Sequence, residues 1–403
     1  MKALFLIFHG FEEANGISKK IRYQIKALKA CGLEVDTCWL DDAHDHKRRM
    51  INNHVLRDYG NGIRGKILKR TELNSIVHYV KTNGMQLVYV RSDHNTTPFL
   101  ICMLWRLKRA GVKVVMEIPT YPYDQEYKGL PWAYRRVLMA DKCLRGLMAT
   151  QIDKFVTFSD HKTIFGRPTI QISNGIDFDF IPLKQSTATT RELHLIAVAT
   201  IHPWHGFDRV IRGLTHYLRH EHREDVKLHI VGQGVPAVVD EYHALVEEGA
   251  IEQNVIFHGP LFGEPLNRVF DQCQIGIGSL GRHRSGITDL RSLKNREYAA
   301  RGIPFIYSET DADFESMPYI LKIPADESPV DIGQVVRFYH SAKEIRPTDI
   351  RASIRNKLSW EVQMRNYETT YKNSLLYPRT LCRKWHGEGT YIKNKLSGRR
   401  FGI

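Results

Sequence analysis

Short apolar runs alternate with longer amphipathic stretches through the first half of the chain. Apolar residues recur there every three or four positions in three segments, which predicts helices near 17–31, 97–110 and 131–149. The short apolar runs predict strands at 3–8, 35–40, 86–91, 113–118 and 154–158. Strands and helices that alternate in this way are typical of a doubly wound parallel sheet.

Two segments of this pattern carry no clear periodicity. The stretch 44–70 is polar and basic, and it predicts an exposed loop-helix segment. Residues 181–192 follow Pro182 with a cluster of Ser and Thr, which favours a linker between domains.

A second series of strands and helices begins after this linker. We expect strands at 193–199, 226–231, 254–258, 274–279 and 304–307, and helices at 207–219, 236–248, 265–273, 291–301 and within 330–376. The pattern predicts an α/β protein with one Rossmann-like domain over residues 1–180 and another over 193–360, followed by a helix and a basic tail at 361–403. Ligands of such open sheets bind at the carboxyl ends of the strands, so we expect a cleft between two facing domains.

Charge is distributed unevenly along the 403 residues. The net charge is +14, and residues 1–180 alone hold 28 Lys and Arg against 18 Asp and Glu. This excess favours an anionic partner, either a membrane surface, a nucleic acid or a phosphorylated substrate, although a solvated surface has the same composition. The basic residues do not interleave with a nucleic-acid motif, so we expect no nucleic acid.

The cysteines and the apolar runs indicate in which cellular compartment the chain is expected. None of the six cysteines lies in a C-x-x-C pair, and no Cys/His cluster has the spacing of zinc ligands, so we expect free thiols in a reducing cytoplasm and no metal site. The N-terminal apolar run is too short for a signal peptide, and no run approaches the ~20 apolar residues of a membrane span.

Glycines before two predicted helices mark candidate ligand loops. Asn15 and Gly16 follow the first strand, where backbone amides at a helix start can approach an acceptor or a phosphate. Gly232 and Gly234 follow the strand 226–231 and suit a phosphate or sugar neighbour. Ordinary turn chemistry is the alternative interpretation of both pairs.

The most specific segment runs from Gly281 to Phe305. Asp289 precedes the predicted helix 291–301, and Lys294 and Glu297 share one face of it because they are three residues apart. The basic stretch before it includes Arg284 between two glycines, as an anion-binding loop would. A capped surface helix with an internal salt bridge is the alternative.

The spacing of Asp289 and Glu297 resembles the E-x7-E motif of the retaining glycosyltransferase family 4, the glycosyl transferases group 1 family, which has the GT-B fold. The first acid is Asp here rather than Glu. Further parts of the resemblance are Asn174-Gly175-Ile176-Asp177, His202-Pro203-Trp204-His205-Gly206-Phe207-Asp208, and Phe257-His258-Gly259-Pro260. Where many relatives place an Arg and a Lys for the diphosphate, this chain has Thr200 and His205, and Lys294, His205 or the basic residues 282–284 are possible substitutes.

The resemblance implies transfer of a hexosyl unit from a nucleotide-diphosphate sugar to a glycan or lipid-linked acceptor, with retention and without a bound metal ion or other cofactor. Such a reaction fits cell-surface polysaccharide synthesis, including lipopolysaccharide or capsule. It further implies that Glu297 binds the donor ribose, with Lys294, His205, Gly232, Gly234, His258 and Arg284 in the donor site, and that Asp289 and Glu117 act as catalytic residues. For Glu117, which ends the strand 113–118, a buried acid that caps the next segment is the alternative.

The basic first domain adds an expected location, the inner face of a membrane, to which the chain would bind peripherally. Ile51, Val55, Leu56 and Ile67 could insert if 46–70 is helical. The alternatives from other classes are a non-catalytic nucleotide-sugar-binding protein and an epimerase or phosphorylase of the same fold.

Overall fold

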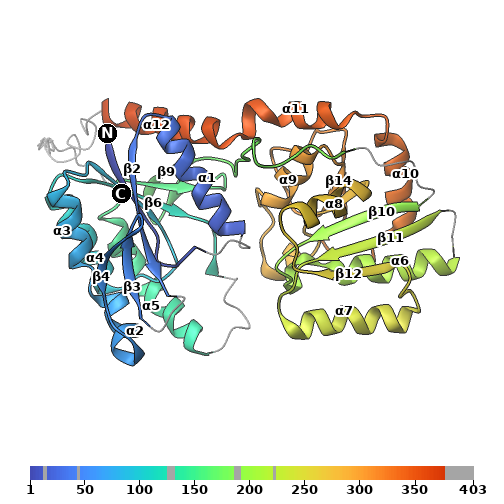
Figure 1. The fold of residues 1–403 in the computed structure, drawn as a ribbon, viewed down its shortest axis with the longest axis horizontal. Helices are drawn as coiled ribbons and strands as arrows, with labels where there is room; N and C mark the ends of the chain where they lie inside the picture. The colour runs from blue at the N-terminus through green and yellow to red at the C-terminus, as the bar shows by residue number, and fades with distance from the viewer. Residues whose placement is uncertain (12–15, 43–45, 125–131, 186–191, 221–223, 377–403) are drawn as a thin grey trace, which may run out of the picture.

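Two α/β domains lie side by side in the computed structural model, which describes residues 1–11, 16–42, 46–124, 132–185, 192–220 and 224–376 (Figure 1). Each domain contains one sheet covered by helices on both faces. The α/β class and the two facing Rossmann-like domains expected from the sequence are therefore confirmed. Asn15 and the basic tail at 377–403 lie outside the described residues.

The first domain holds a nine-stranded sheet in the order β4-β3-β2-β1-β5-β6-β7-β9-β8. Its strands are β1 (Lys2–Leu6), β2 (Glu34–Asp41), β3 (Arg48–Ile51), β4 (His54–Asp58), β5 (Leu87–Arg91), β6 (Lys113–Ile118), β7 (Lys154–Thr157), β8 (Thr163–Ile164) and β9 (Arg167–Gln171). The central strands are parallel, and they are buried on both faces, which explains their continuous apolar runs.

Two antiparallel edges correct the expectation of a purely parallel sheet. Residues 48–58, expected in a loop-helix segment, form the hairpin of β3 and β4 against β2. The helical part of 44–70 is confined to α2 (Gly62–Thr71). Ile51 is buried at 6% exposure, so it cannot insert into a membrane.

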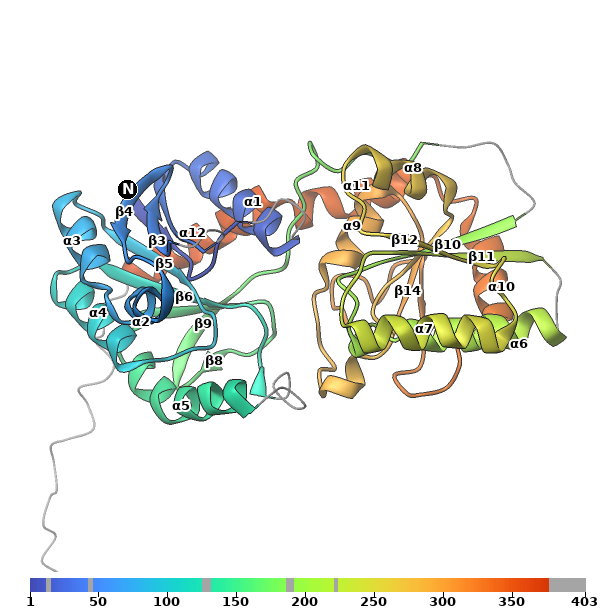
Figure 2. The same ribbon diagram turned by 60° about the horizontal axis from the view of Figure 1, so that its bottom comes forward.

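Helices of the first domain form two layers. The helix α1 (Gly16–Ala30) packs on one face of the sheet together with the C-terminal helix α12 (Trp360–Leu376). The other face is covered by α3 (Asn74–Thr82), α4 (Pro98–Arg109) and α5 (Trp132–Ala149), with α2 packed beside α4. Figure 2 shows α2 and α5 on the side that comes forward, away from α12.

The second sheet has the order β12-β11-β10-β13-β14-β15, and all of its pairs are parallel. This is the strand order of dinucleotide-binding folds, with a crevice where the order reverses between β10 and β13. Its strands are β10 (Glu192–Val198), β11 (Asp225–Val231), β12 (Val255–Gly259), β13 (Ile275–Ile277), β14 (Phe305–Tyr307) and β15 (Ile320–Lys322).

Helices cover both faces of this sheet as well. They are α6 (Phe207–His220), α7 (Pro236–Gly249), α8 (Glu264–Gln272), α9 (Leu293–Arg301), α10 (Ile332–Ala342) and α11 (Pro347–Leu358). In α6, Phe207, Val210, Ile211 and Leu214 are buried at helical spacing and face the sheet. Each such fully buried aliphatic side chain contributes about 1.5–3 kcal/mol to stability.

The domains are joined at one junction where the chain crosses twice. Ile176 bridges Ser359, and a Cβ on Gly175 would lie 2.7 Å from the Trp360 ring, so only glycine fits there. Arg296, which is fully buried, forms two hydrogen bonds to Asp311 and donates to the carbonyl of Asn174. This junction fixes how α9 meets the first domain.

Candidate functional site

A cleft of about 730 Å³ separates the two domains. The first turns of α1 form one wall, with Gly16, Lys19, Lys20 and Tyr23. The opposite wall comes from the carboxyl ends of the second sheet and from α8 and α9, including Val198–Thr200, Val231–Gln233, Pro260–Gly263, Leu266, Asn267, Lys294, Glu297 and Arg301. A cleft at the carboxyl ends of both sheets is where this fold binds ligands.

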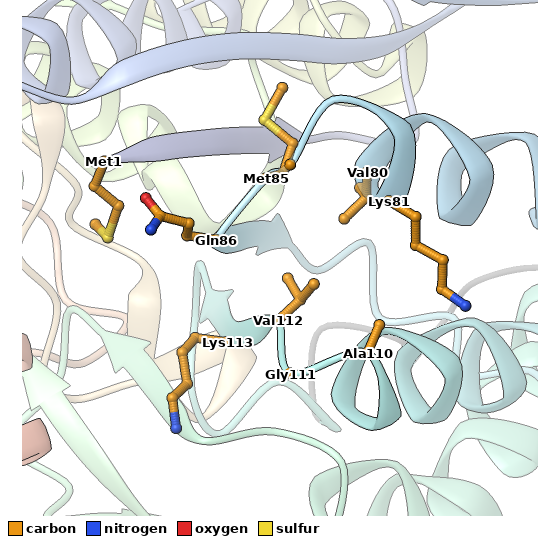
Figure 3. A pocket seen from close by; sticks show the side chains of 10 residues that line it. Met1, Val80, Lys81, Met85, Gln86, Ala110, Gly111, Val112 and Lys113 are labelled. Carbon is orange, nitrogen blue, oxygen red and sulfur yellow. The ribbon is translucent and has the colours of Figure 1, made fainter.

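Another hollow, of about 510 Å³, lies at the opposite edge of the first sheet. Figure 3 shows Met1 and Gln86 on one side of it and Lys81 and Ala110 on the other. It lies at the amino ends of β1, β5 and β6, and its polar side chains are two lysines and one amide. Because no carboxylate lines it and the strands point away from it, we assign the chemistry to the interdomain cleft.

Gly232 and Gly234 are both required by packing. A Cβ on Gly232 would lie 1.8 Å from the Ala199 carbonyl oxygen, and one on Gly234 would lie 1.9 Å from that of Ile201. The two loops that follow β10 and β11 therefore contact each other through backbone atoms. Gly232 also lines the cleft, whereas Gly234 supports the loop behind it.

The helix α9 brings Lys294 and Glu297 to the cleft together, as their spacing predicts. The alternative interpretation had Glu297 paired with Lys294, but Glu297 pairs with Arg301 one turn further along, whose Nε and Nη2 donate to Glu297 Oε1 at 3.0 and 2.9 Å. The other carboxylate oxygen of Glu297 has no hydrogen-bond partner among the described residues, and the side chain is about one-third exposed. It can therefore accept a hydrogen bond from a ligand in the cleft.

Lys294 lies among groups of mixed charge. Its pKa is lowered to about 7, chiefly by burial and then by the positive charge of Arg282, while Glu309 opposes the shift. Glu309 follows β14 and is 2% exposed, and neither of its carboxylate oxygens has a hydrogen-bond partner within the described part of the chain. Burial raises the pKa of Glu309 to about 7.

Glu117 does not reach the cleft surface, since it is 0% exposed. Gln24 Nε2 and Tyr89 Oη each donate to its Oε2 at 2.7 Å, and Arg91 donates to its Oε1. Lys20 Nζ lies 3.6 Å from Oε1. Although burial acts to raise it, Lys20 and Arg91 hold the pKa of Glu117 below its usual value.

Lys20 lies between Glu117 and the cleft. Its ammonium lies 3.5 Å from the centre of the Phe158 ring, and burial lowers its pKa to about 7. Lys20 lines the cleft, whereas Glu117, which was expected to be catalytic, is buried and does not line it.

Asp289 is exposed and lies at the edge of the site. Its Oδ2 accepts from Thr288 Oγ1 at 2.9 Å, and its backbone bridges Thr310, next to Glu309. It is not among the residues that line the cleft, although it lies only four residues before the start of α9 at Leu293.

Two of the groups considered for the diphosphate are engaged elsewhere. His205 Nδ1 accepts from the backbone of His202 at 3.0 Å, and burial holds the pKa of His205 well below its usual value, so its ring is neutral at pH 7. Arg284 donates to both oxygens of Asp208, at 3.0 and 2.8 Å, and also binds Glu327. Neither side chain lines the cleft.

His258 belongs to a row of three imidazoles across the sheet. His229 lies 2.8 Å from His194 and 2.9 Å from His258, as measured between ring nitrogens. Burial lowers the pKa of His229 to about 4. His258 lies beside Pro260, which lines the cleft, so its contribution is to the shape of that loop.

Sequence reasoning missed Lys20 and Glu309. A lysine pair directly after Gly16 looks like a solvated helix face, although the start of a helix at the cleft was a usable signal. Glu309 follows a predicted strand, and the rule that strand ends line the ligand site would have singled it out.

Comparison with known proteins defines the fold and the class of the second domain. Residues 192–319 match the family model of the Glycosyl transferases group 1. The chain is similar to a glycosyltransferase from Rickettsia africae, with 12% identity and a TM-score of 0.59 over 93% of this chain and 98% of that one.

Two further similar structures hold nucleotides. Anabaena HepE in complex with UDP is 15% identical, with a TM-score of 0.57 over 92% of this chain and 100% of that chain. The catalytic domain of Arabidopsis thaliana starch synthase IV, bound to ADP and acarbose, is 12% identical, with a TM-score of 0.61 over 93% and 99%. No curated protein matches the sequence.

At these identities the structural likeness establishes the fold, which is GT-B. Within the second domain, residues 192–319 match the glycosyl transferases group 1 model, and this match supports a glycosyl transfer function.

Proposed function

We propose that this protein transfers a hexosyl unit from a nucleotide-diphosphate sugar to a hydroxyl of a glycan or lipid-linked acceptor, with retention. The observation that carries the proposal is the placement of Lys294 and Glu297 on one helix in a cleft between two Rossmann-like domains. The expected setting is the synthesis of cell-surface polysaccharide, such as lipopolysaccharide or capsule.

The donor would bind along the second domain. Glu297 would accept hydrogen bonds from the ribose hydroxyls, and Lys294 would neutralise the diphosphate as a point charge. A diphosphate beside Lys294 would raise the pKa of this lysine and charge it on binding. A lysine that becomes charged on binding would stabilise the negative charge that develops on the leaving group.

The first domain would supply a second cation. Lys20 lies at the amino end of α1, where the helix dipole also favours an anion. Glu117 would fix the Lys20 ammonium, and Asp289 would hold hydroxyls of the donor sugar when the domains close. In this scheme basic side chains neutralise the leaving group, and we propose that no bound metal ion is required.

Location is part of the same proposal. Among the described helices, none combines the length and the apolar character that a membrane crossing requires. We propose that the chain acts at the inner face of a membrane and binds there peripherally through its basic first domain.

The test is to mix the protein with UDP-, GDP- and ADP-sugars and to measure both binding and product. Release of a nucleoside diphosphate together with glycosylated acceptor supports a transferase, whereas sugar interconversion identifies an epimerase and binding without turnover identifies a binding protein. Glu297→Gln should lose donor binding, and Glu248→Gln on the exposed side of α7 is the matched control. Wild-type kinetics in Glu297→Gln would refute the assignment of the donor site.

A further inference from the structure

Three neighbouring helices of the first domain expose large apolar side chains to solvent. The helix α4 packs between α2 and α5. Together these helices hold eight of the fourteen exposed large apolar side chains in the described part of the chain. We call this surface the α2–α4–α5 face, and its apolar members are Ile63, Ile67, Phe99, Trp105, Trp132, Tyr134, Met139 and Leu147.

The exposed apolar residues follow helical spacing. Trp132, Met139 and Leu147 lie along one side of α5, while Leu138 and Met148 on its other side are buried in the core. A surface helix of a soluble domain normally has a single apolar stripe, and that stripe faces the core. The second stripe of α5 has no partner among the described residues.

The helix α4 also exposes apolar side chains on one side and buries others on the opposite side. Phe99 and Trp105 are 49% and 44% exposed, while Leu100 and Leu104 beside them are buried. Large apolar side chains that are exposed on three neighbouring helices indicate an interaction surface.

Charge on the α2–α4–α5 face has a single sign. The three helices contain eleven Lys and Arg and one acid, Asp141, which is 1% exposed and accepts hydrogen bonds from Thr96 and Tyr123. Several of the bases pair with carboxylates on neighbouring loops. Four exposed bases, Arg64, Lys66, Arg135 and Arg136, have no carboxylate partner among the described residues.

We infer that the α2–α4–α5 face docks on an anionic lipid bilayer. Basic side chains are attracted to anionic headgroups, and apolar side chains between them can enter the boundary of the acyl chains. Tryptophan favours this boundary, and the Arg136 and Arg109 guanidinium groups lie 4.4 and 4.8 Å from the rings of Trp132 and Trp105. Apolar side chains scattered among bases on convex helices fit a fluid surface, which conforms to them.

This inference deepens the proposed peripheral membrane binding by naming its surface, and it does not depend on the proposed transferase activity. It also narrows the docking surface expected at residues 46–70 to the helical part of that segment, α2. Of the apolar residues expected to insert there, Ile51 is buried and Val55 lies on β4, so that only Ile67 belongs to the α2–α4–α5 face.

The first arm of the test removes apolar side chains. Flotation of the full-length protein with vesicles of phosphatidylcholine alone, or with a third of phosphatidylglycerol, measures binding. Wild type should bind the anionic vesicles and should dissociate as salt increases, because surface charge is screened. Ile67→Ser/Phe99→Ser/Trp132→Ser should weaken this binding at least tenfold.

The second arm removes charge. Arg64→Gln/Arg135→Gln/Arg136→Gln should also weaken binding to anionic vesicles at least tenfold, and it should leave the unfolding temperature unchanged because these side chains are exposed.

The matched control removes the same charge elsewhere. Arg212→Gln/Arg337→Gln/Arg346→Gln changes three exposed arginines of the second domain, which are 50%, 64% and 76% exposed, and should bind as wild type does. The inference is overturned if wild type does not bind anionic vesicles, if it binds neutral ones equally, or if both variants bind unchanged. A wild-type dimer that the apolar variant converts to a monomer would assign the face to a second copy instead.

Discussion

The two walls of the cleft each present a lysine whose pKa is about 7, and each lysine has a buried glutamate as its neighbour. In the first domain the neighbour of Lys20 is Glu117, which accepts hydrogen bonds from Gln24, Tyr89 and Arg91. In the second domain the neighbour of Lys294 is Glu309, whose two oxygens have no hydrogen-bond partner in the residues that the structure describes.

This difference in hydrogen bonding gives the two glutamates different expected roles: Glu117 stabilises its surroundings, whereas Glu309 can still accept hydrogen bonds. A carboxylate with its hydrogen bonds satisfied stabilises the groups that surround it, and it has little capacity left for a ligand. A buried carboxyl without partners costs free energy in the folded protein, and proteins retain such a group where a ligand supplies the missing bonds. The first wall is therefore preorganised around Glu117, whereas Glu309 keeps unused hydrogen-bonding capacity behind Lys294.

The largest expected effect is on stability and concerns Glu117. Glu117→Gln leaves Arg91 and Lys20 buried without a counter-charge, which should lower the free energy of unfolding by about 3–5 kcal/mol. Urea denaturation monitored by circular dichroism measures this change. Glu248→Gln on the surface should stay within about 0.5 kcal/mol of wild type. Equal stability of Glu117→Gln and wild type would show that Glu117 does not stabilise the first domain.

The next effect is on turnover and concerns Lys294. Lys294→Met removes the charge that faces the proposed diphosphate, so kcat/KM for the donor should fall about 100-fold, or about 2.7 kcal/mol. Lys294→Arg should retain part of the activity because it keeps the charge. Steady-state kinetics with the donor found by screening measure both, and Lys343→Met at an exposed position of the second domain is the control. Full activity of Lys294→Met would place the diphosphate elsewhere.

A smaller effect is expected at Glu309. Its raised pKa means that its contribution to stability is fully present below about pH 4.5 and is lost as the pH rises through 7. Glu309→Gln should therefore lose this pH dependence, and it should be at least as stable as wild type at pH 8. If the donor supplies the missing hydrogen bonds, kcat/KM should fall about tenfold, or about 1.4 kcal/mol. A stability loss like that of Glu117→Gln would remove the contrast between the two walls.

The fold followed from periodicity because most strands are buried on both faces and most helices are amphipathic. The hairpin of β3 and β4 was missed because Arg48, Arg49 and Arg57 interrupt the apolar pattern. Arg49 is nevertheless fully buried, and it donates to the Ile7 carbonyl at 3.0 Å. A buried arginine that bonds to distant backbone looks polar in the sequence, and so the strand looks like a loop.

The candidate site followed from the sequence only where its residues share one helix. Lys294 and Glu297 are three residues apart, so helical geometry alone brings them together. The partners of Glu117 lie 26 to 97 positions away, and only the folded sheet shows that they enclose it. Burial of that kind depends on tertiary packing, which residue type and spacing do not encode.

The smallest expected effect is the pH dependence of nucleotide binding. Lys294 has a pKa of about 7 in the free protein, against an ordinary value of 10.5, so it is half charged at pH 7 and mostly neutral at pH 8. A bound diphosphate favours the charged form, so binding should take up a proton above pH 7, and affinity should fall about fivefold between pH 7 and 8. Calorimetry in two buffers with different ionisation enthalpies measures this uptake directly. Lys294→Arg should abolish the contribution of this residue because arginine stays charged, and any slope that remains would then come from Lys20. An affinity that does not change with pH in wild type would show that neither lysine meets the diphosphate.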